Sequence, residues 1–213
     1  MITEFAGGLN SDVAANARGD NVAVFAGPAG DGFAVFARSR ARAGGPWGPR
    51  ARISGVSAGR PGDLRVAVDG IGRALVAWRR QVAGGGGDLR YSMRPTATGA
   101  WGRDRSLVSA TSTAIASPAL AFADGRGTYA WGEVGTAGWQ VRRATLDLAS
   151  STPRTWSVGA PLALGIIPWV AVAPSGEAAA IGAATRSTGV GGGSGGAVKA
   201  PPTPPARRFG RRP

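Results

Sequence analysis

Short apolar runs separated by turns rich in Gly and Asp occur along most of this chain, and they predict β-strands. The clearest pair is 66–68 and 74–78, which flanks a turn at 69–73 and therefore predicts a hairpin. Residues 89–94 then alternate apolar and polar positions, the period-two pattern of a half-buried strand. A further apolar segment at 101–108 completes a unit of four strands.

The same order of segments is found before and after this unit. Further hairpins are expected over 13–25, 120–131 and 169–181, with third strands at 33–37 and 139–144 and closing segments at 47–53 and 156–162. The hairpin turns are predicted at Arg18-Gly19, Gly70-Ile71-Gly72, Gly125-Arg126-Gly127 and Ser175-Gly176.

Two residue types mark the period of these units. A tryptophan recurs at Trp47, Trp101 and Trp156, with spacings of 54 and 55 residues. A turn glycine recurs at Gly19, Gly72, Gly127 and Gly176. Periods of this size, made of short apolar runs broken by Gly and Asp, indicate stacked β units.

An all-β fold of tandem four-stranded antiparallel units of about 54 residues follows from this pattern. The units span about 11–56, 57–110, 111–165 and 166–188, and the last is half a unit. The first two strands of each unit are apolar on both faces, whereas the third carries Arg or Ser at alternate positions, which places the first strand innermost. This order is typical of a β-propeller blade, so residues 1–188 are expected to form a partial β-propeller, with Trp78 and Trp131 buried between sheets. A two-sheet sandwich is the competing architecture, but it gives no reason for the sequence period.

The units resemble bacterial β-propeller repeats and, more loosely, the sialidase-like family whose hairpins carry an Asp-box turn. The stretches that carry the resemblance are 43–48, 95–102 and 151–157. They keep the tryptophan and the turn, but the Ser and Asp of the box are missing from the first two, and only Thr155-Trp156 matches in the third. The resemblance implies a propeller that is degenerate at this motif.

The chain is strongly basic, with a formal net charge of +13, and a basic surface attracts polyanions. Residues 1–190 contain 20 Arg and all 12 acidic residues, and the tail adds five positive charges. The tail, 189–213, is rich in Gly, Pro and Arg and is expected to be disordered. Candidate polyanion-binding residues on the units are Arg79, Arg80, Arg90, Arg94, Arg142 and Arg143.

Most catalytic and metal chemistry is excluded by composition. The chain has no His and no Cys, so triads, Cys or His metal sites and disulfides cannot form. The only lysine is Lys199, outside any phosphate-binding loop motif. Tyr91 and Tyr129 occupy apolar strand positions, which indicates packing rather than catalysis. The turn acids, Asp20, Asp31, Asp69 and Asp124, provide one carboxylate per turn, fewer ligands than calcium needs.

We therefore expect no catalytic residue, no metal and no cofactor, and a non-enzymatic binding or scaffold module. A polyanion-binding module for nucleic acid or acidic glycan is the alternative, and a degenerate glycosidase-like propeller or a gene fragment is a further one. The sequence does not identify a partner, and the candidates are a second protein, another copy of the chain and a polyanion. No membrane insertion is expected, since the longest apolar run, 162–173, is about half a membrane span. Residues 1–9 do not read as a signal peptide, and localisation stays open: export is expected if the true start lies upstream, and the cytoplasm otherwise.

Overall fold

The computed structural model describes residues 10–41, 43–81, 87–111, 115–135 and 138–148, together with strand segments at 157–158, 163–164, 167–172 and 178–183. In these residues the fold is all-β and every strand pairing is antiparallel, with no helix. The expected all-β class is thus confirmed. Trp156 and the tail at 189–213 lie outside the described residues, so the predictions made for them stay predictions.

The strands form sheets from consecutive stretches of chain. The first sheet has the order β1 (Ser11–Ala15), β2 (Asn21–Ala29), β3 (Gly32–Arg40), β4 (Ala51–Arg52). The second has the order β5 (Gly62–Val68), β6 (Ala74–Gln81), β7 (Gly87–Arg94), β8 (Arg105–Thr111). The third contains β9 (Ile115–Ala123), β10 (Arg126–Gly135) and β11 (Gly138–Asp147), with β12 (Ser157–Val158) and β13 (Ala163–Leu164) both pairing to β11. A last pair is formed by β14 (Ile167–Val172) and β15 (Ala178–Ala183).

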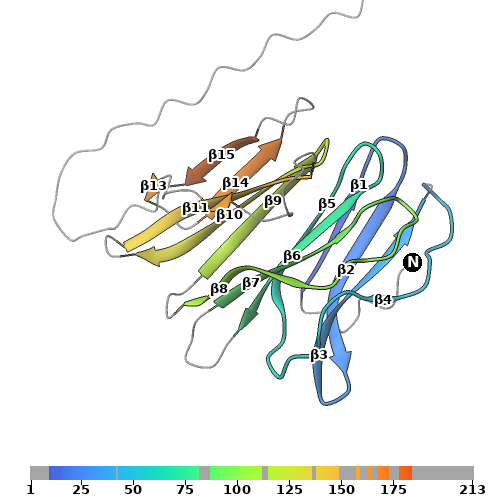
Figure 1. Cartoon of the computed structure of the whole chain (residues 1–213), viewed down its shortest axis with the longest axis horizontal. Helices are drawn as coiled ribbons and strands as arrows, with labels where there is room; N and C mark the ends of the chain where they lie inside the picture. Colours follow the sequence, from blue (N-terminus) through green and yellow to red (C-terminus); the bar gives the residue numbers. More distant parts are fainter. Residues whose placement is uncertain are drawn as a thin grey trace, which may run out of the picture.

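The sheets follow one another in chain order, from the blue first sheet to the orange last pair (Figure 1). The first strands of neighbouring sheets lie against each other, β1 with β5, β5 with β9 and β9 with β14. Side chains of β1 and its turn also bond to the next sheet: Asp12 accepts from the Val66 amide at 2.9 Å, and Asn16 donates to the Asp69 carbonyl at 2.8 Å. The described sheets do not close into a ring.

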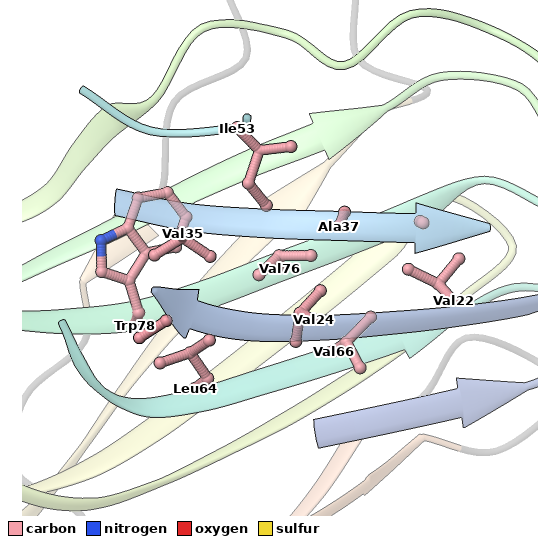
Figure 2. Close-up of a cluster of buried hydrophobic side chains, with 11 residues drawn as sticks. Val22, Val24, Val35, Ala37, Ile53, Leu64, Val66, Val76 and Trp78 are labelled. Atoms are coloured by element: carbon pink, nitrogen blue, oxygen red, sulfur yellow. The ribbon is translucent and has the colours of Figure 1, made fainter. Parts of the chain in front are cut away.

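The hydrophobic core lies between successive sheets. One cluster joins β2 and β3 of the first sheet to β5 and β6 of the second, with Val24, Val35, Leu64 and Trp78 among its members (Figure 2). The second cluster joins the opposite face of β6 and β7 to β9, β10 and β11. Trp78 is 1% exposed and Trp131 0% exposed, so their expected burial between sheets is confirmed.

The third hairpin turn was predicted at the wrong residues. It consists of Asp124 and Gly125, with φ angles of 47° and 79°, and Arg126 already pairs with Ala123 as the start of β10. Two consecutive residues with positive φ are characteristic of a two-residue type I′ turn, for which Asp-Gly is a favoured sequence. Gly127 therefore lies in the strand, and Gly125 takes the left-handed conformation that Gly72 has 53 residues earlier.

The first two hairpins instead share a longer turn. In each turn, the side chain of the first residue accepts two backbone N–H bonds. Asn16 accepts from Arg18 and Asp20, and Asp69 accepts from Ile71 and Arg73. The fourth residue is a glycine with positive φ, Gly19 or Gly72. A side chain at Gly72 would also clash, because an added Cβ would lie 2.6 Å from the Cβ of Ala97. The predicted fourth turn, at 175–176, lies outside the described residues.

Two features differ from the strand-level expectations. The closing tryptophans Trp47 and Trp101 precede the fourth strands instead of lying in them. The third strand of the second sheet, β7, is mostly buried although it carries Arg90 and Arg94, because one of its faces is turned to the first sheet. Arg90 pairs there with Asp88, and Arg94 donates to the carbonyl of Gly72. Charge on a strand therefore did not mean exposure to solvent.

Candidate anion-binding groove

The six arginines predicted to bind a polyanion do not form one surface. Register places Arg80, Arg90 and Arg94 on the face of the second sheet that carries Trp78 and packs on the first sheet. Arg79 is on the opposite face, toward the third sheet. On β11, Arg142 lies opposite Trp131, whereas its neighbour Arg143 belongs to the other face.

Four of these six arginines are held in ion pairs. Arg79 bonds to Asp63 at 2.7 Å, and Arg142 bonds to Glu133 at 2.9 Å. Arg80 bonds to Asp88 at 2.6 Å. Arg90 contacts both Asp88 and Asp104, at 3.3 and 3.2 Å, while Ser106 donates to Asp88. Their charge is thus largely neutralised within the sheets, which reduces what they offer to an external anion.

Arg94 is the one of the six that lines a cavity described here. This groove, with a volume of about 500 Å³, lies between the loop joining β3 to β4 and the loop joining β7 to β8. Its charged lining residues are Arg40, Arg52 and Arg94, and no carboxylate lines it. Ser39, Thr98 and the backbone of Gly48 and Gly99 add polar groups. A concave site with a few convergent polar groups is a reasonable first hypothesis for a ligand-binding site.

Two of the groove arginines are positioned by tryptophans in the same way, 54 residues apart. The guanidinium of Arg40 lies 4.9 Å from the ring centroid of Trp47, and that of Arg94 lies 5.5 Å from that of Trp101. Cation–π stacking uses the face of a guanidinium and leaves its in-plane N–H donors for oxygen ligands. The sequence showed the regular tryptophans but not this partner, since Arg40 and Arg94 precede them by seven residues.

Arg94 is the most enclosed of these cations. It is 4% exposed and donates to the carbonyl of Gly72 at 3.3 Å. Burial lowers the pKa of Arg94 from its usual value, and the negative charge of Asp20 partly opposes that shift. The Nε atoms of both Arg40 and Arg94 are buried and make no hydrogen bond in the described part of the structure. A bound oxyanion would supply the acceptor that these donors lack.

The acidic residues of the hairpin turns have structural roles in the turns themselves. Asp69 is 2% exposed, bonds to its own turn and pairs with Arg73, and Asp20 accepts a bond from Asn16 at 2.8 Å. Asp124 forms part of the type I′ turn. No group of three or more acidic side chains suited to a metal ion occurs among the residues that the structure describes.

The tyrosines are packed between the second and third sheets. Tyr91 is 6% exposed and Tyr129 is 0% exposed, and both belong to the cluster shared by these sheets. A fully enclosed Tyr129 ring has no access to a substrate in this conformation.

The buried Tyr129 predicts a loss of stability at alkaline pH. Burial, followed by the charge of Asp63, raises the pKa of Tyr129 well above its usual value near 10. Above about pH 10 the unfolded chain releases this proton while the folded chain keeps it, so stability falls as pH rises. We expect Tyr129→Phe to lose less stability than the parent chain between about pH 9 and 11 in urea unfolding. Parallel pH profiles for the two proteins would contradict this assignment.

Comparisons with known proteins give no family for this chain. No protein-family model matches it, and no curated protein matches it. The part of the chain described by the structure contains no helix able to span a membrane. The geometry of the groove is therefore the principal guide to what the chain binds.

Proposed function

We propose that the chain is a non-enzymatic binding module of partial β-propeller type that recognises anionic ligands in the groove between its first two sheets. The succession of first strands β1, β5, β9 and β14 supports the propeller part of the proposal. The observation that carries the binding part is a groove with Arg40, Arg52 and Arg94 and no lining carboxylate.

The contrast with the rest of the second sheet strengthens this choice. Arg80 and Arg90 sit within hydrogen-bond or ion-pair distance of Asp88, whereas none of the groove arginines has an acidic partner within that distance among the described residues. A guanidinium pairs with the planar or tetrahedral oxyanions of carboxylates, phosphates and sulfates through two parallel N–H bonds. The groove therefore offers strong donors to a ligand rather than to the protein itself.

The test is a titration of the full chain with inorganic phosphate, followed by amide and indole NMR shifts. We expect saturable shifts at Gly48, Gly99 and the indole of Trp101, and we expect Arg52→Gln to weaken them. Arg126→Gln is the matched control, because Arg126 is exposed on the third sheet and its contact to Asp147 is 3.7 Å long. Shifts that avoid the groove, or that are equally affected by both substitutions, would overturn the proposal.

A further inference from the structure

We infer that the outer face of the first sheet, together with the rim of the groove, binds single-stranded nucleic acid. The inference rests in part on the proposed function, since Arg40 and Arg52 belong to both surfaces. The outer face is the side of the first sheet that faces away from the second sheet. Phe25, Ala34 and Phe36 form its apolar centre and are grouped separately from the core between the sheets.

Arginines surround this apolar centre. Strand register puts Arg52 directly opposite Phe36, and Arg38 and Arg40 follow Phe36 on the same face of β3. Arg50 is exposed, and its guanidinium lies 4.3 Å from the centroid of the Phe36 ring. No acidic residue of β1 to β4 belongs to this face, because Asp12 points to the second sheet and bonds to Val66. The charges that strands β1 to β4 carry on this face are therefore of one sign.

Comparison with the second sheet shows which acidic residues are missing from the outer face of the first sheet. Positions 54 residues later carry Asp88 in place of Ala34, Asp104 in place of Arg50 and Ser106 in place of Arg52. In the second sheet these three residues form the network that neutralises Arg80 and Arg90. The first sheet has Ala26 and Phe36 where the second has Arg80 and Arg90, and it has Arg50 and Arg52 where the second has Asp104 and Ser106. Its positive charge therefore lies at other positions, and neither acid of the network is present there.

Nucleic acid fits this surface better than an acidic glycan does. Both would meet the N–H donors with oxyanions, and the positive charge would attract duplex as well as single strands. Arg40 and Arg50, however, are planar groups held against Trp47 and Phe36 at 4.9 and 4.3 Å. Phe25 and Phe36 are each only 5% exposed, so the surfaces open to a ligand are the guanidinium planes of Arg40 and Arg50. Unpaired bases stack on such planes, an interaction that a glycan lacking π-faces cannot make in the same form. Single strands expose those bases, whereas a duplex hides them.

The experiment measures fluorescence anisotropy of a labelled 20-nucleotide oligothymidine with the full chain at two salt concentrations. We expect the logarithm of affinity to fall with the logarithm of salt concentration with a slope of about −0.7 per phosphate contact, and Arg50→Ala with Arg52→Ala to reduce that slope by about 1.4. Arg50→Lys keeps the charge but loses the planar stack, so we expect it to weaken binding by about fivefold or more. Arg126→Lys on the third sheet is the control and should bind as the parent does.

Several results would overturn the inference. They are no binding at about 50 mM salt, equal affinity for the parent and Arg50→Lys, and heparin binding at least as tight as oligothymidine binding. The last two would indicate simple charge attraction. Because Arg50 is exposed and makes one cation–π contact, its substitution should lower the melting temperature by only about 1–4 °C, and a melting curve for each variant checks that it is folded. Phosphate shifts confined to the groove without oligothymidine binding would refute this inference alone, whereas oligothymidine binding that depends on Arg50 without groove shifts would refute the proposed function alone.

Discussion

Replacing Trp78 by alanine is expected to cost about 3–5 kcal/mol of stability and to unfold much of the population. The side chain is 1% exposed and lies in the cluster that joins the first two sheets (Figure 2). Its removal leaves a large cavity between two sheets that are joined chiefly by such packing, and the surrounding β-structure can relax only in part. Urea unfolding followed by intrinsic fluorescence and by circular dichroism measures the loss.

Trp47→Ala is the matched control for this prediction. Trp47 is half-buried, lies outside the strands and stacks on Arg40. Its loss should cost about 1 kcal/mol, the scale of one cation–π contact with modest burial. Equal unfolding midpoints for the two variants would mean that the contact between the first two sheets does not depend on Trp78.

Asp69→Ala is expected to destabilise the chain by about 2–4 kcal/mol. The carboxylate accepts the amides of Ile71 and Arg73 at 3.2 and 2.8 Å and forms an ion pair with the Arg73 side chain. The alanine variant leaves two backbone donors without acceptors in a tight turn and leaves Arg73 without its acid. Thermal unfolding of the variant and the parent at one pH measures the difference.

Asp69→Asn separates the turn from the ion pair. Asn16 occupies the same place in the first hairpin and accepts the amides of Arg18 and Asp20, each at 3.0 Å. An asparagine at 69 can therefore keep both backbone bonds. It loses only the negative charge that pairs with Arg73, so we expect a cost of about 1 kcal/mol or less. If the asparagine variant were as unstable as the alanine variant, the ion pair rather than the turn would be the stabilising feature.

The strands could be predicted from the sequence because apolar runs and Gly or Asp turns are local signals. These local signals do not fix the exact turn residues at the third hairpin. Both glycines in Asp124-Gly125-Arg126-Gly127 fit the pattern, and only the positive φ angles of Asp124 and Gly125 identify the turn. The hydrophobic pattern of 74–78 also indicated correctly that Trp78 is buried. Such inferences need no knowledge of which residue lies opposite which.

The candidate site could not be predicted in the same way. Whether Arg80 is neutralised depends on the cross-strand register that sets it opposite Asp88. The groove combines residues from two loops about 54 positions apart, so neither loop alone indicates it. One signal was present in the sequence: aligning the units places Ala34 and Arg50 where the next unit has Asp88 and Asp104. That comparison identifies the first sheet as the one that has neither of these two acids.

Hydrogen–deuterium exchange of the full chain, with and without oligothymidine at low salt, tests the location of the binding surface most directly. Bound ligand slows amide exchange where it covers or stabilises the backbone. We expect protection at residues 34–52 and 94–101, which carry the outer face of the first sheet and the rim of the groove. Protection confined to β11 around Arg142 and Arg143, with residues 34–52 unchanged, would contradict the account.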